Sequence, residues 1–210
     1  LQPDNPEETL DYVRGIFSDF GIYNKTKGCY PIILGAQETS VLNMVVSYAA
    51  ITNGGKLVDA HFVHDQKSSD LMVQQPSHRG LTTTNEASLF QLKNILGGVV
   101  RSGTARRALK QYKDLVGGKT GTSTGSNDAW FIGFSNDIVV GVWVGYDNGV
   151  KGQKRLTLSG GTGGGLAAPI ARDVFTEAFK FYPPQPLIDT APATVSLVQE
   201  KGYVEAYKGG

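Results

Sequence analysis

The spacing of apolar residues along the chain predicts a set of amphipathic helices. Apolar side chains recur three and four positions apart over residues 6–20, 41–51, 84–102 and 169–181. Thr83 and Glu86 have the spacing of a capping box, so Thr83 is expected to begin the third helix. The second helix, capped by Thr39 or Ser40, is apolar almost all round, and we expect it to be buried.

In the middle of the chain the pattern changes to that of strands. It predicts strands over Leu115–Thr122, Ala129–Phe134 and Asp137–Tyr146. Ser135-Asn136 is a short polar break, as in a tight antiparallel hairpin. The last strand carries β-branched and aromatic residues at successive positions, which is typical of a strand buried on both faces.

The first of these strands has an unusual composition. It contains Gly117, Gly118 and Gly121, which weaken a strand because they offer no side chain to pack. A strand of this kind commonly lets another molecule approach its backbone closely. Lys119-Thr120-Gly121-Thr122 is therefore the most informative stretch of the sequence.

Two further features each allow two interpretations. The glycine-rich run Ser159–Gly165 precedes a helix, as in a phosphate-binding loop. It lacks the G-x-x-x-x-G-K-[ST] pattern, so a flexible linker into a packing helix is the preferred interpretation. Arg101, Arg106 and Arg107 lie at or beyond the end of the third helix, where they complement its dipole or bind an anion; the first is preferred.

Composition narrows the class of protein. A chain of 210 residues can bury a full core and forms one domain or a large part of one. A net charge of +1 argues against nucleic acid as a partner, and no apolar run approaches the ~18 residues of a membrane span. The single Cys29 excludes an internal disulfide. His61 and His64 lack a third spaced ligand, which favours surface positions, and we predict neither metal nor cofactor.

Several segments together resemble the transpeptidase domain of class A penicillin-binding proteins. The resemblance is carried by Lys119–Thr122, Asp128–Phe134 and Val142–Asp147. Shorter matches flank them at residues 33–38, 53–55, 98–100, 103–105, 164–165 and 167–170. The resemblance covers roughly Pro6–Pro183 and is far more specific than a lone Lys-Thr-Gly. It implies an α/β fold of the α+β type, an antiparallel sheet flanked by helices as in penicillin-binding transpeptidases and serine β-lactamases.

The sequence departs from this family in one respect. The family carries S-x-x-K, S-x-N and K-T-G motifs, and the first two are absent from these 210 residues. We therefore expect residues 1–183 to be the C-terminal part of a transpeptidase domain, whose N-terminal remainder is a companion fragment carrying the nucleophile. A degenerate, inactive relative is the alternative. Residues 184–210 are predicted to be a weakly ordered tail with one possible strand, Thr194–Val198.

The K-T-G strand is the predicted site. Lys119 supplies a positive charge that attracts an anionic acyl donor and biases a nearby hydroxyl toward proton transfer, which makes it the predicted catalytic residue. Gly121 lets an extended peptide lie against the strand, and the hydroxyls of Thr120 and Thr122 can hold a carboxylate. By resemblance, the Thr122 N–H is one donor of an oxyanion hole. Ser123, Thr124 and Ser126 are weaker candidates for substrate contact.

The resemblance implies a serine D,D-transpeptidase that cross-links peptidoglycan stem peptides, releases D-alanine and is acylated by β-lactams. It also implies an upstream glycosyltransferase domain, and a catalytic unit on the periplasmic face of the cytoplasmic membrane, anchored through upstream sequence. A related D,D-carboxypeptidase or β-lactamase would share K-T-G but not the Asp128–Phe134 and Trp143–Asp147 pattern. A non-catalytic module of the same fold is the other alternative.

Overall fold

The computed structural model describes residues 6–23, 30–60, 79–80, 85–146, 156–188, 195–200 and 203–208. The chain forms two compact units, Leu1–Thr84 and Asn85–Gly210, and each is described by itself. His61, His64, Cys29, Thr83 and Asp147 lie outside the described residues.

The described residues of the first unit form two α-helices, a 3-10 helix and a short pair of strands. In chain order these are α1 (Pro6–Asp19), η1 (Tyr30–Leu34), α2 (Val41–Thr52), β1 (Lys56–Leu57) and β2 (Arg79–Gly80). The predicted first helix is confirmed, with Pro6 at its start and Glu7 and Glu8 in its first turn. Leu10 of α1 packs with Tyr23 and Ile32 in a small core.

Helix α2 begins as predicted, but it is less buried than expected. Of the two candidate caps, Ser40 is the one used: its Oγ accepts from the N–H of Asn43 at 3.0 Å. Only Ser47, Ala50 and Ile51 of α2 are buried, and Leu42 is 45% exposed. The two-residue strand β1 packs on α2 within its unit and is too small to cover the helix on all sides.

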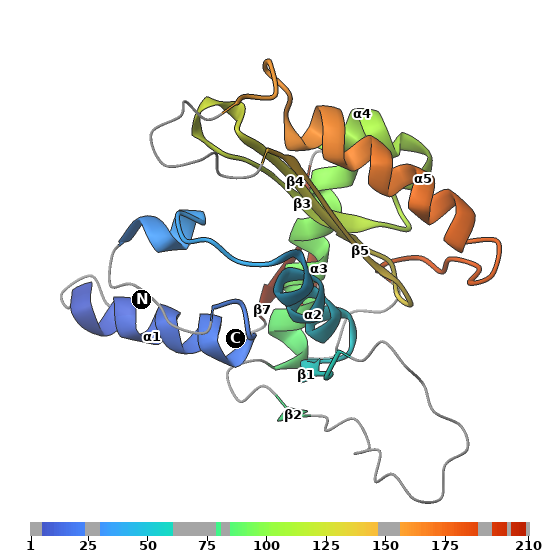
Figure 1. Ribbon diagram of the computed structural model, residues 1–210. Coiled ribbons are helices and arrows are strands. Elements are labelled where there is room, and N and C mark those ends of the chain that lie inside the picture. The colour runs from blue at the N-terminus through green and yellow to red at the C-terminus, as the bar shows by residue number, and fades with distance from the viewer. Residues whose placement is uncertain are drawn as a thin grey trace, which may run out of the picture. The chain divides into compact units, whose positions relative to one another are not determined.

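The second unit is built on an antiparallel sheet with strand order β3-β4-β5. The strands are β3 (Gly117–Thr122), β4 (Asp128–Phe134) and β5 (Val139–Gly145). Around them lie α3 (Glu86–Arg101), α4 (Arg106–Leu109), η2 (Lys110–Tyr112), η3 (Thr124–Ser126), the π-helix η4 (Gly163–Ala167) and α5 (Ala168–Ala178). In Figure 1, α3 lies against one face of the sheet, and α4 and α5 lie together on the other.

Strand β4, not β5, is the most buried strand of this sheet. Every residue of β4 from Phe131 to Phe134 is buried, whereas β5 buries only Val140 and leaves Trp143 37% exposed. The prediction that the last strand is buried on both faces was therefore wrong, because among the described strands β5 is at the edge. The predicted hairpin is confirmed; Ser135 closes it, and its Oγ accepts from the N–H of Ile138 at 3.2 Å.

The core of the second unit lies between the sheet and helices α4 and α5. Its fully buried members include Phe131, Phe175, Leu109, Val116 and Val100. Burying a side chain of this size contributes about 1.5–3 kcal/mol to folding. Side chains alternate along a strand, so Phe134 points to the face of the sheet opposite to this core. That face is the α3 side, since Gly117 lies next to both Phe134 and Gly97 of α3.

Helix α3 begins later than predicted and ends with a side chain folded back onto it. Its N-cap is Asn85, whose Oδ1 accepts from the N–H of Ser88 at 2.8 Å, so the capping box at Thr83 was wrong. Asn is as good a cap as Thr, and it stands closer to the first buried position. Arg101 donates to both the backbone O and the Oδ1 of Asn94 at 2.9 Å, so its guanidinium lies along α3.

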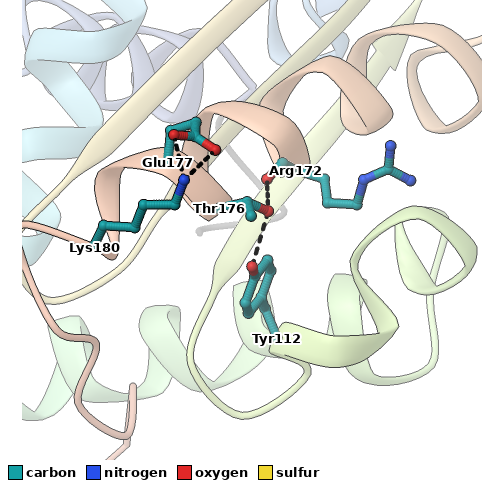
Figure 2. Close-up of polar contacts among 5 residues, drawn as sticks. All are labelled: Tyr112, Arg172, Thr176, Glu177 and Lys180. Atoms are coloured by element: carbon teal, nitrogen blue, oxygen red, sulfur yellow. Dashed lines mark hydrogen bonds and ion pairs between the residues drawn. The ribbon is translucent and has the colours of Figure 1, made fainter.

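A chain of hydroxyl groups ties α5 to the segment before the sheet (Figure 2). The Oγ1 of Thr176 donates to the carbonyl of Arg172 at 2.8 Å, and it lies 2.9 Å from the hydroxyl of Tyr112. A hydroxyl carries one proton, so Thr176 accepts here and Tyr112 donates. In the same picture Lys180, just beyond α5, pairs with Glu177 of that helix.

The C-terminal part contains one more strand than predicted. Val195–Glu200 (β6) pairs antiparallel with Tyr203–Lys208 (β7). Just before them, the Leu187 N–H donates to the carbonyl of Asp114 at 2.9 Å, and Leu187 is buried. The second strand was missed because it is short and its apolar and polar residues do not alternate strictly. The predicted boundary at residue 183 stays a prediction.

Candidate active site at the edge of β3

Strand β3 presents peptide groups along a free edge. The Ser123 N–H donates to the carbonyl of Asp128 at 3.1 Å, one step beyond the Thr122–Ala129 pair. Bonded and non-bonded pairs alternate in an antiparallel ladder, so the peptide groups of Thr120 and Thr122 point away from β4. Among the described residues no strand pairs with that edge. The outward peptide groups of β3 thus take no part in the described sheet.

The side chains of the K-T-G-T stretch divide between the two faces of β3. Lys119 and Gly121 share one face, and Thr120 and Thr122 share the other. Lys119 is exposed, and its Nζ donates to the carbonyl of Thr120 at 2.8 Å. The ammonium group therefore lies beside a peptide group of the free edge, where it places a positive charge next to any chain bound there.

Both threonine hydroxyls are held by groups outside the strand. Thr120 is 9% exposed, and its Oγ1 lies 2.6 Å from the Oγ1 of Thr104 in the turn between α3 and α4. Thr122 is exposed, and its Oγ1 accepts from the N–H of Gly163 at 3.1 Å. Segments far apart in the sequence thus meet at β3, and sequence reasoning did not assign Thr104 or Gly163 to the site.

The glycine-rich run is a packed helical turn rather than the flexible linker we expected. Residues Gly163–Ala167 form a π-helix that continues into α5, with Thr162 capping it through an Oγ1 that accepts from the N–H of Gly165 at 3.1 Å. A Cβ added at Gly163 would lie 2.3 Å from the carbonyl O of Trp130, and one at Gly164 would lie 2.3 Å from that of Thr104. These glycines are needed for close packing against the sheet and the α3–α4 turn.

The connection that follows β3 is fixed by local hydrogen bonds. The Ser123 Oγ accepts from the N–H of Asp128 at 2.8 Å. Gly125 and Ser126 both have positive φ angles, 75° and 54°. The carboxylate of Asp128 accepts from the indole N–H of Trp143 at 3.1 Å, which joins the start of β4 to β5. The contacts of Ser123 and Asp128 thus hold the end of β3 in place.

Two other features are absent from the described residues. There, no group of three or more His, Cys, Asp or Glu side chains could hold a metal ion. None of the helices in that part of the chain is both long and apolar enough to cross a membrane.

Comparison with known proteins identifies the family. Residues 15–176 match the penicillin binding protein transpeptidase domain. The chain therefore belongs to the family of penicillin-binding protein transpeptidase domains, as the K-T-G context predicted. It is 34% identical over 231 aligned residues to penicillin-binding protein 1A of Rickettsia conorii, and 33% identical over 153 to that of Neisseria meningitidis. It spans 28% and 18% of the lengths of these relatives.

Solved structures of class A penicillin-binding proteins have the same fold. Penicillin-binding protein 1A from Haemophilus influenzae superposes with a TM-score of 0.77 at 22% identity, over 96% of this chain and 37% of that one. PonA1 from Mycobacterium tuberculosis in complex with penicillin V gives a TM-score of 0.56 at 22% identity, over 95% of this chain and 55% of that one. The predicted fold class, an antiparallel sheet flanked by helices, is confirmed.

Proposed function

We propose that this chain supplies the K-T-G part of a serine D,D-transpeptidase site that cross-links peptidoglycan stem peptides and reacts with β-lactams. The observation that carries the proposal is the free edge of β3, where the peptide groups of Thr120 and Thr122 point outward beside the Lys119 ammonium. In acyl transfer the stem peptide lies antiparallel along this edge and gains main-chain hydrogen bonds. The absent side chain of Gly121 leaves room for it.

The residues divide the chemistry between them. Lys119 is the catalytic residue of this chain: its charge attracts the anionic acyl donor and favours proton transfer at a neighbouring hydroxyl. The hydroxyls of Thr120 and Thr122 bind the terminal carboxylate of the peptide or of a β-lactam. The outward N–H of Thr122 donates to the oxyanion that forms as the carbonyl is attacked. No step assigned to these residues needs a cofactor.

The nucleophile comes from outside these 210 residues. No serine here is followed three positions later by lysine, and Ser-x-Asn is also absent. In our proposal the N-terminal remainder of the same domain brings the serine, its lysine and the second motif to the edge of β3. The complete enzyme acts at the periplasmic face of the cytoplasmic membrane, anchored through upstream sequence.

Two other functions use the same fold. A D,D-carboxypeptidase or β-lactamase transfers the acyl group to water instead of an amine, and the match to penicillin-binding protein 1A sequences favours the transpeptidase. A non-catalytic module would bind the peptide without forming an acyl-enzyme. Its signature would be a parent gene whose upstream sequence lacks S-x-x-K.

A covalent label tests the proposal. We expect fluorescent penicillin to leave the 210-residue chain unlabelled and to label the intact protein, or a companion fragment that carries S-x-x-K, with a mass increase of one penicillin. Label on this chain itself would place the nucleophile here. An intact protein that takes no label would contradict the proposal and favour the non-catalytic module.

A further inference from the structure

The hydroxyl groups of Thr104 and Thr120 form the contact on which this inference rests. Their oxygens are 2.6 Å apart, although the residues are separated by 16 positions, and either atom can be the donor. Thr120 is buried at 9% exposure, whereas Thr104 is exposed in the turn after α3. The partner of the buried hydroxyl is therefore a side chain that lies at the surface beside the site.

The turn that carries Thr104 is fixed by backbone contacts on both sides. The Ala105 N–H donates to the carbonyl of Val99 at 3.1 Å, and the Arg106 N–H donates to that of Gly103 at 3.1 Å. Ala105 is fully buried, and Gly164 of the π-helix packs against the carbonyl of Thr104. The backbone that carries the Thr104 side chain is thus held by contacts within the protein itself.

A bound carboxylate determines which of the two hydroxyls donates. A threonine hydroxyl has one proton and two lone pairs, and a carboxylate only accepts. If Thr120 donates its proton to a carboxylate, it can only accept from Thr104, which then becomes the donor. The resulting chain runs from Thr104 to Thr120 to the carboxylate, and each bond polarises the next.

The second hydroxyl of the strand is arranged in the same way. The Oγ1 of Thr122 accepts from the backbone N–H of Gly163 at 3.1 Å, which leaves its own proton available for a ligand. Both hydroxyls therefore have a donor behind them. For Thr122 that donor is a backbone N–H, whereas for Thr120 it is a side chain that can be changed without altering the backbone.

We propose that Thr104 is a positioning residue that directs the Thr120 hydroxyl toward the carboxylate of the acyl donor. The inference rests on the proposed function and adds a specificity determinant to it. Thr104 acts through Thr120 and does not itself touch the substrate. It increases the preference of the site for a donor with a free carboxylate, and contributes nothing to donors that lack this group.

The test compares two acyl donors on the intact protein, benzylpenicillin and its methyl ester, which lacks the free carboxylate. The second-order acylation rate is measured for wild type, Thr104→Val and Thr104→Ser. We expect Thr104→Val to lower the rate with benzylpenicillin about tenfold, as loss of a charge-assisted hydrogen-bond chain does, and to leave the ester's rate unchanged. Thr104→Ser, which keeps the hydroxyl group, should retain the wild-type ratio of the acylation rates with benzylpenicillin and its methyl ester. Thr157→Val, at an exposed loop position, is the matched control.

Each outcome has a distinct meaning. If the acylation rates of Thr104→Val with the two acyl donors are unchanged, or fall by the same factor, the role of Thr104 is overturned and the proposed function stays intact. A wild-type protein that neither donor acylates would refute the proposed function, and the role of Thr104 with it. Thr104→Ala, with melting temperatures for every variant, repeats the comparison if valine disturbs the turn.

Discussion

The backbone N–H of Gly163 donates to the side-chain oxygen of Thr122 across 41 residues of sequence. This contact joins the first residue of the π-helix to the last residue of the K-T-G-T stretch. The glycine-rich run is therefore a structural part of the site at β3, and its packing against the sheet sets where the Thr122 hydroxyl lies.

Replacing Gly163 with alanine should disturb this contact directly. The new Cβ would lie 2.3 Å from the carbonyl O of Trp130 and 2.6 Å from that of Gly121, and backbone atoms cannot yield cheaply. We expect a loss of about 1–3 kcal/mol in the free energy of unfolding, measured in urea, and slower penicillin labelling. Gly98→Ala is the control: in α3 its Cβ has no described neighbour within 4 Å, so it should be neutral or stabilising.

The core between the sheet and α5 should depend strongly on Phe175. Its side chain is fully buried, and its ring centroid lies 5.5 Å from that of Phe179. Phe175→Ala should lower the free energy of unfolding by about 3–5 kcal/mol, because it removes buried area and leaves a cavity. Phe181→Ala, at a position 78% exposed, should change it by less than about 0.5 kcal/mol. Equal effects would contradict the packing described for α5.

The hydrogen bonds in Figure 2 predict that a substitution at Tyr112 lowers the free energy of unfolding by less than Phe175→Ala does. Tyr112→Phe removes the donor to Thr176 and keeps the edge-to-face ring contact with Phe179. We expect a loss of about 0.5–1 kcal/mol in a urea titration, since this hydrogen bond is exposed to solvent. Tyr182→Phe, at an exposed position beyond α5, should leave stability unchanged. A loss of stability in Tyr182→Phe as large as that in Tyr112→Phe would contradict a stabilising hydrogen bond from Tyr112 to Thr176.

Burial raises the pKa of Tyr48 in α2 to about 12 from the ordinary value of 10.0. The folded protein then keeps the phenolic proton at a pH where the unfolded chain has lost it, so stability is present below pH 10 and is lost between about pH 10 and 12. Unfolding followed across this range should show a steeper decline in wild type than in Tyr48→Phe. Tyr12→Phe, at an exposed position, should keep the wild-type slope.

Much of the second unit could be predicted from sequence because local patterns decide it. The hairpin Asp128–Gly145 follows from two apolar runs around a polar break, and α5 from its apolar spacing. The burial of β5 could not be predicted, because consecutive β-branched residues suit an edge strand as well as a central one. The cap of α3 was misplaced because Thr83 and Asn85 are both good capping residues.

The candidate site could likewise be predicted only in part from the sequence. Lys119–Thr122 was identified because glycines in a strand are a local signal. Thr104 and Gly163 were not assigned to it, since their contacts with Thr120 and Thr122 cross 16 and 41 residues and have no local signature. The glycines at 163 and 164 suggested flexibility. In the structure they are required because the nearby carbonyls of Trp130 and Thr104 leave no space for a side chain.

The central claim is that β3 completes an acyl-transfer site, and the rate of penicillin acylation of the intact protein tests it most directly. Lys119→Met should lower this rate at least ~100-fold, because it removes the charge and proton-transfer assistance at the strand edge. Lys113→Met, whose side chain is 63% exposed six positions earlier, should react at the wild-type rate. A Lys119→Met protein that is acylated as fast as wild type would contradict the account.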